Sequence, residues 1–370
     1  MFAAEKPPPL SKEELFAYLS DCPQADARRS GLTYVEEQAA GFRRLRWGRG
    51  FTYRDADDVT VRCSRLRRRF RALAVPPAWT EVWISSNPKA HLLASGRDSA
   101  GRKQYIYHPR FQRARSETKF RRMVAFGTLL PGLRAAVRAD LERDDLSRKR
   151  VAAAVVALLD ESHARVGHDE YAKKNDSYGL TTLSCEHVSR PRKDSVDLSF
   201  VGKAGRAWDL ELHDAAIVST IRDCVDLPGD RLFRYERAGE LRDLTADDVN
   251  QYIGRTSGHA LYAKDFRTWA GCALATRYLR RLTAESERAV EISGAVKKVA
   301  HELQNTPAVC RSSYIAPPLL EATPLRKAEA QRAHLGDRTR RPEFDFYENE
   351  CLTLAVLRNR YNLSAITRDE

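Results

Sequence analysis

The sequence predicts an α+β fold: a small β-rich N-terminal domain over residues 1–115, followed by a mostly α-helical domain over residues 116–370 with a small β-hairpin sheet. Two periodicities support this division. Between Leu32 and His108, short stretches of alternating apolar and polar residues are separated by glycines and prolines, as in antiparallel sheets. After residue 116 the apolar residues recur at helical spacing, and alternating segments between residues 177 and 212 predict the hairpin.

The β-rich domain begins with a short helix. Residues 1–10 are rich in proline, and we expect them to be disordered. Ser11 and Glu14 form a capping-box pattern, which predicts a helix over residues 12–19. The strands that we expect after it cover residues 32–35, 51–54, 59–62, 81–86, 91–95 and 105–107.

The last of these strands carries polar and aromatic side chains out of a glycine-bearing turn. In the segment GRDSAGRKQYIY, residues 96–107, alternation places Tyr105 and Tyr107 on one face of the strand and Gln104 on the other. Arg97 and Arg102 lie in the turn itself. The segment is typical of a binding surface, and the plainer alternative is a hairpin with one core tyrosine.

The helical domain is predicted from periodicity and from capping residues. The first long helix is expected over residues 119–143. Ser147 is a typical N-cap for a second helix, and Gly167 is available to end it. Three further helices are predicted over residues 245–254, 265–282 and 283–303, and the apolar segment 351–357 is expected to pack on this domain.

The composition indicates a polyanionic partner. Lysine and arginine outnumber the acidic residues by 63 to 50, which gives a formal charge of +13. Arginines cluster around Trp47 and around Phe70, a pattern that suits phosphate contacts but is also that of a solvated helix face. We find neither a secretory signal nor an apolar run long enough to span a membrane, so we expect a cytoplasmic protein.

The seven cysteines predict neither a disulfide framework nor a metal site. They are odd in number, widely spaced and include no C-x-x-C pair, so we interpret them as reduced thiols. His163 and His168 are five residues apart without an H-E-x-x-H pattern, which gives no ground for a zinc site. We predict no metal and no cofactor.

The second domain contains residue types that metal-free cleavage of a phosphodiester would need. That reaction needs a nucleophile, cations or donors for the non-bridging oxygens, and an acid for the leaving oxygen. Tyr314 follows a short helix bounded by prolines, Arg165 and Arg267 lie at helix ends, and Lys203 lies in a hairpin. Each residue alone has a commoner structural explanation, such as an ion pair or a solvated lysine.

The order of the surrounding segments resembles the poxvirus-type and bacterial type IB DNA topoisomerases. The resemblance begins at GLTY, residues 31–34, and covers most of the chain. The segments that carry it are PPAWTEVWIS, HLLASGRDSAGRKQYIYHPRF, ARVGHDEYAKKNDSYGLTTL, FVGKAGR, KDFRTWAG and NTPAVCRSSYI. A series of dispersed motifs in the right order is specific.

The resemblance assigns a role to each candidate residue. It implies that Tyr314 is the nucleophile, that Arg165 and Arg267 bind the phosphate, and that Lys203 is the general acid toward the 5′ oxygen. The activity that it implies is relaxation of supercoiled duplex DNA through a 3′-phosphotyrosyl intermediate, without ATP or metal.

Two further phosphate contacts follow from the same resemblance. Lys264, three residues before Arg267, is implied as an auxiliary contact. Nine residues before Tyr314 the poxvirus enzymes have histidine, whereas this chain resembles bacterial members in having Asn305. An amide donates a hydrogen bond but carries no charge, so it stabilises the transition state less than an imidazolium does.

The resemblance also implies how the protein meets DNA. The two domains would form a clamp around duplex DNA as a monomer, with Gln104, Tyr105, Tyr107, Arg97 and Arg102 at the DNA surface. Such a partner places the protein in the cytoplasm, associated with the nucleoid.

Two other functions were weighed against this one. A tyrosine recombinase uses the same nucleophile and arginines, but usually carries H-x-x-R where this chain has Lys264-Asp265-Phe266-Arg267, and its N-terminal half is helical. A non-catalytic DNA-binding or architectural protein would keep the fold and charge without turnover. The candidate catalytic positions are filled, which favours the enzyme.

Overall fold

The computed structural model describes residues 10–37, 39–189, 194–280, 288–321, 324–325 and 345–363. The chain divides into two compact units, a smaller one over residues 20–120 and a larger one over residues 1–19 and 121–370. The disorder expected for residues 1–10 falls outside the described residues, except for Leu10. Among the described helices, none is long and apolar enough to cross a membrane.

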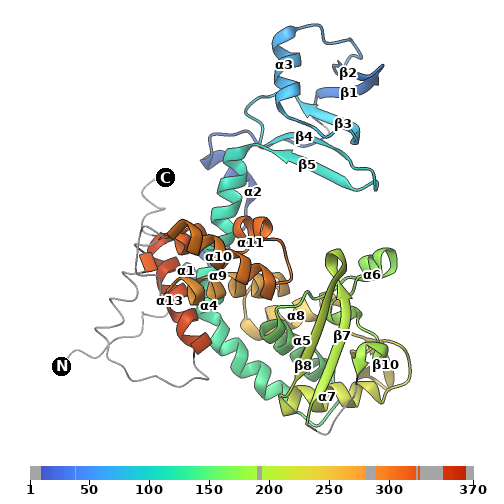
Figure 1. The fold of residues 1–370 in the computed structure, drawn as a ribbon, viewed down its shortest axis with the longest axis vertical. Coiled ribbons are helices and arrows are strands. Elements are labelled where there is room, and N and C mark those ends of the chain that lie inside the picture. The colour runs from blue at the N-terminus through green and yellow to red at the C-terminus, as the bar shows by residue number, and fades with distance from the viewer. Residues whose placement is uncertain are drawn as a thin grey trace, which may run out of the picture. The chain divides into compact units, whose positions relative to one another are not determined.

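The smaller unit is built on one five-stranded sheet (Figure 1). Every neighbouring pair is antiparallel. Phe70 of helix α3 (Ser64–Ala72) is buried in a core cluster with Ile84 and Val82 of the sheet, so this helix covers one sheet face. In sheet order the strands are β2 (Gly50–Arg54), β1 (Gly41–Trp47), β3 (Thr80–Ser85), β4 (Leu92–Arg97) and β5 (Lys103–Tyr107). Helix α2 (Pro23–Arg29) precedes the strands in sequence.

The prediction missed β1 because an arginine occupies an inward position. Arg44 is 8% exposed, and its guanidinium donates to the carbonyls of Val75, Pro76 and Trp79 at 2.8–2.9 Å. Leu45 beside it is 38% exposed, so the polarity pattern of the strand is inverted. Arg44 is therefore a structural residue rather than a surface cation.

Two predicted strands in this unit are wrong, and one helix was not predicted. Residues 32–35 and 59–62 contribute only isolated bridges, Thr33 to Ala90 and Thr60 to Arg54. Helix α3 was not predicted because five of its nine residues are arginines and only Leu66 and Phe70 supply apolar periodicity.

The larger unit is mainly helical and carries two small sheets (Figure 1). Helix α9 (Ala263–Leu279) is buried along most of its length and contacts α5, α10 and α13. The boundary between the two units falls within helix α4 (Pro109–Leu141). The other helices are α1 (Lys12–Leu19), α5 (Arg148–Ser162), α6 (Asp169–Asn175), α7 (Ala215–Val225), α8 (Ala246–Ser257), α10 (Arg288–Glu302), α11 (Pro307–Ser313) and α13 (Asp345–Arg360). The sheets are β6 (Val188–Ser189), β7 (Val196–Gly202) and β8 (Arg206–Leu212), and β9 (Arg234–Arg237) with β10 (Glu240–Asp243).

The α+β prediction is confirmed, and its local errors lie at element ends and in short elements. Ser147 caps α5 as predicted, but the helix ends at Ser162 and not at Gly167, because His163 adopts the left-handed conformation with φ 58°. Residues 177–187 contain two 3-10 turns instead of a strand. The predicted packing of residues 351–357 is confirmed by the burial of α13 side chains against α9.

Candidate active site

Tyr314 is presented at the end of α11. Thr306 caps this helix through its hydroxyl, and Pro307 occupies the first turn, where its missing N–H costs nothing. The Tyr314 N–H donates to the carbonyl of Cys310 at 3.0 Å, which fixes the tyrosine at the C-terminal end of the helix. The residue is half-buried.

The backbone of Tyr314 lies directly against α9. A Cβ atom on Gly271 would stand 2.6 Å from the Tyr314 carbonyl oxygen and 2.8 Å from the Tyr314 Cβ, so only glycine allows this approach. The next residue, Cys272, donates its thiol to the same carbonyl at 3.4 Å. One turn earlier on α9, the guanidinium carbon of Arg267 lies 5.4 Å from the centre of the Tyr314 ring. Helix α9 thus holds both the backbone and the ring of the tyrosine.

Arg267 is a buried cation whose guanidinium is held by carbonyl groups. It is 4% exposed, and it donates to the carbonyls of His163 and Leu303, the latter at 2.7 Å. In the described part of the chain no carboxylate pairs with it, and its Nε has no hydrogen-bond partner. Burying such a charge is costly unless an anion completes the site.

Arg165 adds a second positive charge at this point. Burial lowers the pKa of Arg267 from its ordinary value, and the charge of Arg165 lowers it further, whereas Tyr314 acts in the opposite direction. Burial raises the pKa of the Cys310 thiol to about 11, and the charges of both arginines oppose that rise. Two arginines, the tyrosine and the thiol therefore share one electrostatic environment.

The backbone around Arg165 is fixed by a close approach between two glycines. The carbonyl of Arg165 accepts from the N–H of Leu180 at 2.9 Å. Gly179 lies so near that an added Cβ would be 2.6 Å from that carbonyl and 2.5 Å from the nitrogen of Gly167. Gly167 has φ +98°, a conformation that favours glycine. The half-buried Arg165 side chain thus projects from a rigid loop.

Asn305 lies in the loop between α10 and α11. Its side-chain oxygen accepts from the N–H of Thr306 at 2.9 Å, and its own N–H donates to the carbonyl of Ala300 at 2.8 Å. The acceptor end of the amide is therefore engaged, and the NH2 end is the part of the side chain that can donate. The same loop is held to α9, because the Leu303 carbonyl accepts from Arg267.

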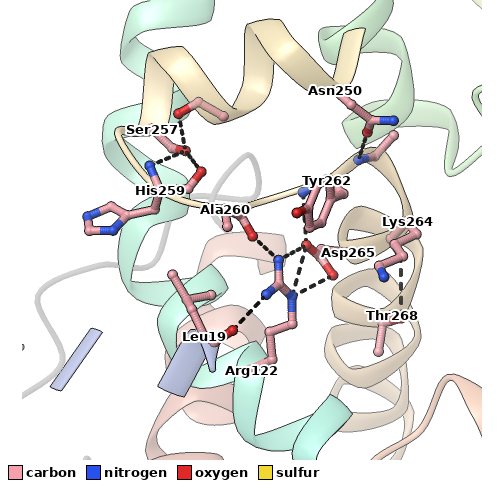
Figure 2. A network of polar contacts seen from close by, with 12 residues as sticks. Leu19, Arg122, Asn250, Ser257, His259, Ala260, Tyr262, Lys264, Asp265 and Thr268 are labelled. Atoms are coloured by element: carbon pink, nitrogen blue, oxygen red, sulfur yellow. Dashed lines mark hydrogen bonds and ion pairs between the residues drawn. The ribbon is translucent and has the colours of Figure 1, made fainter. Parts of the chain in front are cut away.

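The start of α9 is held by a buried ion pair, shown in Figure 2. Arg122 of α4 contacts Asp265 at 2.9 Å and also donates to the carbonyls of Leu19 and Ala260. Asp265 accepts from the N–H of Tyr262 as well, at 2.9 Å. The exposed Lys264 lies beside this pair with its amino group 5.2 Å from the Tyr262 ring centre. These contacts set the position of α9 and thereby of Arg267.

Lys203 lies at the tip of the β7–β8 hairpin. The strands pair up to Gly202 and Arg206, and the three-residue turn places Ala204 and Gly205 at positive φ, 64° and 68°. The residue is exposed. The structure thus brings Tyr314, Arg165 and Arg267 into one environment, and it places Lys203 on the β7–β8 hairpin.

In the smaller unit, the residues predicted to meet DNA lie on and beside β5. Tyr105 is 46% exposed and stacks on Tyr107, with ring centres 5.8 Å apart, and Gln104 instead donates to Asp98 at 2.9 Å. The predicted alternation of faces is confirmed. Arg97 and Arg102 are ion-paired, with Glu81 at 2.8 Å and Asp98 at 2.9 Å respectively.

Sequence reasoning missed the residues that hold the site in place. The roles of Gly271, Cys272, Arg122 and Asp265 depend on contacts between segments far apart in the chain, and no local pattern signals them. Only the glycine that ends the motif RTWAG, Gly271, could have indicated a close approach on that face of the helix. No cluster of metal-binding side chains was found among the residues that the structure describes.

Two family models match the chain. One, described as the catalytic core of eukaryotic DNA topoisomerase I, matches residues 108–333. The other, described as the N-terminal domain of bacterial DNA topoisomerase IB, matches residues 50–98.

Individual relatives are viral and fungal proteins. DNA topoisomerase 1B of Acanthamoeba polyphaga mimivirus is 30% identical over 296 residues, which are 77% of this chain and 88% of that protein. DNA topoisomerase 1B of Vaccinia virus (strain Copenhagen) is 20% identical, over 62% of this chain and 72% of that protein. DNA topoisomerase 1 of Mycosarcoma maydis is 24% identical over 52% of this chain, but the match spans only 21% of that longer protein.

Proposed function

The chain belongs to the type IB DNA topoisomerases, and from this membership we propose that it relaxes supercoiled duplex DNA with Tyr314 as the nucleophile. One observation carries the assignment of the site. Arg267 is a buried guanidinium without a carboxylate partner among the described residues, and it lies over the Tyr314 ring beside the charge of Arg165. A phosphate is an anion that suits such a site.

The first chemical step is attack on the DNA backbone. The Tyr314 oxygen forms a bond to phosphorus, and the bond from phosphorus to the 5′ oxygen breaks on the opposite side. Arg165 and Arg267 donate to the non-bridging oxygens, whose negative charge grows in the pentacovalent transition state, and the Asn305 amide adds a neutral donor. Lys264 contributes a further contact from the start of α9.

Lys203 is proposed to protonate the departing 5′ oxygen. An alkoxide is a poor leaving group, so an acid placed on that side of the phosphate accelerates the step. The exposed tip of the hairpin can follow the DNA surface, whereas Arg267 is held on α9, Tyr314 at the end of α11 and Arg165 in the loop after α5. Support for this role is the family motif FVGKAGR around Lys203.

The product of this step conserves the energy of the broken ester. The 3′-phosphotyrosyl bond is attacked by the 5′ hydroxyl in the reverse reaction, with Lys203 now accepting the proton, so no nucleotide is consumed. Between the two steps the free end rotates about the intact strand, and superhelical torsion drives the change in linking number. The two arginines supply the charge that a metal ion supplies in other phosphoryl-transfer sites.

DNA binding is proposed to involve both parts of the chain, the N-terminal domain over residues 1–115 and the catalytic domain over residues 116–370, acting as a monomeric clamp. Tyr105, Tyr107, Gln104, Arg97 and Arg102 would meet DNA from the first domain. The net charge of +13 supports this partner. The logarithm of affinity should fall with the logarithm of salt concentration with a slope of about −0.9 per phosphate contact. The protein would then act on the nucleoid in the cytoplasm.

A single-turnover reaction tests the proposed roles separately. The protein is mixed with a duplex whose cleaved strand releases a short 5′ fragment, and the covalent adduct is measured on a denaturing gel. Arg267→Gln and Arg165→Gln should slow adduct formation by about 10²–10³-fold. Lys203→Ala should slow it too, but a substrate with sulfur at the 5′ bridging position should restore the rate, because a thiolate leaves without a proton. If sulfur rescues the arginine variants as well, the assignment of Lys203 is wrong.

A further inference from the structure

The larger unit contains a cavity. None of the residues proposed to act in the reaction takes part in lining it. It has a volume of about 770 Å³ and lies between α4, α5 and α9, with residues from α7, α10 and α13 at its edges. Its apolar wall is formed by Leu130, Leu133, Val137, Val156, Ile217 and Leu274. A cavity of this size is in the range that holds small organic molecules. We call it the acidic cavity, for the charges described next.

The charged residues of the wall give this cavity the opposite sign to the chain. Of the residues that the structure describes, five carboxylates and three arginines line it, a net of −2 in a protein whose net charge is +13. Two of the arginines are already neutralised: Arg134 contacts Asp160 and Glu350, and Arg138 contacts Asp214. A polyanion such as DNA is therefore a poor occupant, and a cation is favoured.

These pairs leave over two carboxylates, Glu302 and the exposed Glu161, and Glu161 is the one that matters here. Within the described residues it makes neither a hydrogen bond nor an ion pair. Burial raises its pKa, and the charges of Asp214 and Asp160 raise it further, so an added positive charge would relieve the repulsion at this point. Glu302, which also lines the cavity, accepts from the hydroxyl of Tyr278.

We propose that the acidic cavity binds a small organic cation, an ammonium or guanidinium group on an apolar body. The cationic group would lie at Glu161, and the body would cover the leucine and valine side chains of α4 and α5. A neutral or anionic molecule of the same shape would lack the ionic contact with Glu161. Nothing in this binding step depends on DNA.

The acidic cavity borders the groups that hold the phosphate-binding arginine. His163 lines the cavity, and its carbonyl accepts from Arg267. Phe266, which also lines it, immediately precedes Arg267, and Glu302 precedes Leu303, whose carbonyl is the second acceptor. A bound cation would thus share its cavity with one anchor of Arg267, His163, and with the residues that precede Arg267 and its second anchor, Leu303. This coupling rests on the proposed function, whereas the binding does not.

Calorimetric titration of the full-length protein without DNA tests the binding. The probes are 4-phenylbutylammonium, 4-phenylbutan-1-ol and 4-phenylbutanoate, which differ in charge but share one apolar body. The ammonium should bind at least about tenfold more tightly than the alcohol, and Glu161→Gln should remove that advantage without weakening the alcohol. Glu186→Gln, which makes the same charge change at an exposed residue outside the cavity, should leave all affinities unchanged.

One further variant and the single-turnover cleavage rate complete the test. Ala157→Phe fills the cavity from α5 and should abolish binding of the ammonium and the alcohol alike. The proposal is overturned if the three probes bind equally, if none binds, or if Glu161→Gln leaves the preference intact. With the ammonium bound, the single-turnover cleavage rate should change by about fivefold or more in the wild type and not in Ala157→Phe. An unchanged rate in a protein that binds the ammonium refutes the coupling alone.

Discussion

Replacing Gly271 with alanine tests how closely the nucleophile is held by α9. The new Cβ would stand 2.6 Å from the Tyr314 carbonyl oxygen, where ordinary contact begins at 3.4 Å, so the two backbones must separate by about 0.8 Å, the difference between these distances. Overpacking of this kind costs about 1–3 kcal/mol of stability. A displacement of about 1 Å of a reacting group can cost on the order of 10²-fold in rate. We therefore expect Gly271→Ala to fold, to bind DNA and to cleave it about 100-fold more slowly.

The assay combines three measurements on one protein preparation. Adduct formation in a single turnover gives the cleavage rate, fluorescence anisotropy at fixed salt gives DNA affinity, and circular dichroism gives the fold. Gly294→Ala is the matched control, because nothing lies within 4 Å of its added Cβ and alanine favours a helix by up to about 1 kcal/mol. A cleavage rate for folded Gly271→Ala within about threefold of the wild type would refute the reasoning.

Three further predictions concern the groups around this contact. Arg122→Met leaves Asp265 buried without its partner, so urea unfolding should show a loss of about 3–5 kcal/mol, and a loss below about 1 kcal/mol would contradict this role. Burial holds the pKa of His163 below its ordinary value of 6.5, so the unfolded state takes up the proton first as pH falls. Wild-type stability should therefore fall below about pH 6.5 more steeply than that of His163→Asn, and parallel pH curves from thermal melts would exclude this contribution. Asn305→His should make the cleavage rate rise as pH falls below about 7, because the imidazolium adds a charge that the amide lacks, whereas the wild-type rate should lack that rise.

Much of the fold was predictable because the spacing of apolar residues along the chain indicates which positions are buried. The hairpin of β7 and β8, the capped start of α5 and helices α8 to α10 have regular patterns in which most inward positions are apolar, although α9 also buries Asp265 and Arg267. Strand β1 was not predicted because Arg44 lies at an inward position, where its guanidinium donates hydrogen bonds to three carbonyl groups. The end of α5 was misplaced because His163, rather than a glycine, adopts the left-handed conformation there. Both errors arise from tertiary contacts overriding local preference.

The candidate site was predictable residue by residue only through the order of motifs. Tyr314, Arg165 and Arg267 lie on three segments more than 40 residues apart, and the structure brings them into one environment through α9. The contacts that align them are a missing side chain at Gly271 and carbonyl groups on other segments, which leave no signature in composition or spacing. These contacts exist only in the folded chain.

The central claim is that Tyr314 forms a transient covalent bond to DNA during relaxation. The most direct measurement is relaxation of a negatively supercoiled plasmid in EDTA without nucleotide, by the wild type and by Tyr314→Phe, with denaturing detection of protein-linked DNA. We predict relaxation and a covalent adduct for the wild type, and neither for the phenylalanine variant, which should still retard the plasmid on a gel. A wild-type protein that binds the plasmid but leaves its linking number unchanged over a range of salt concentrations would contradict the account.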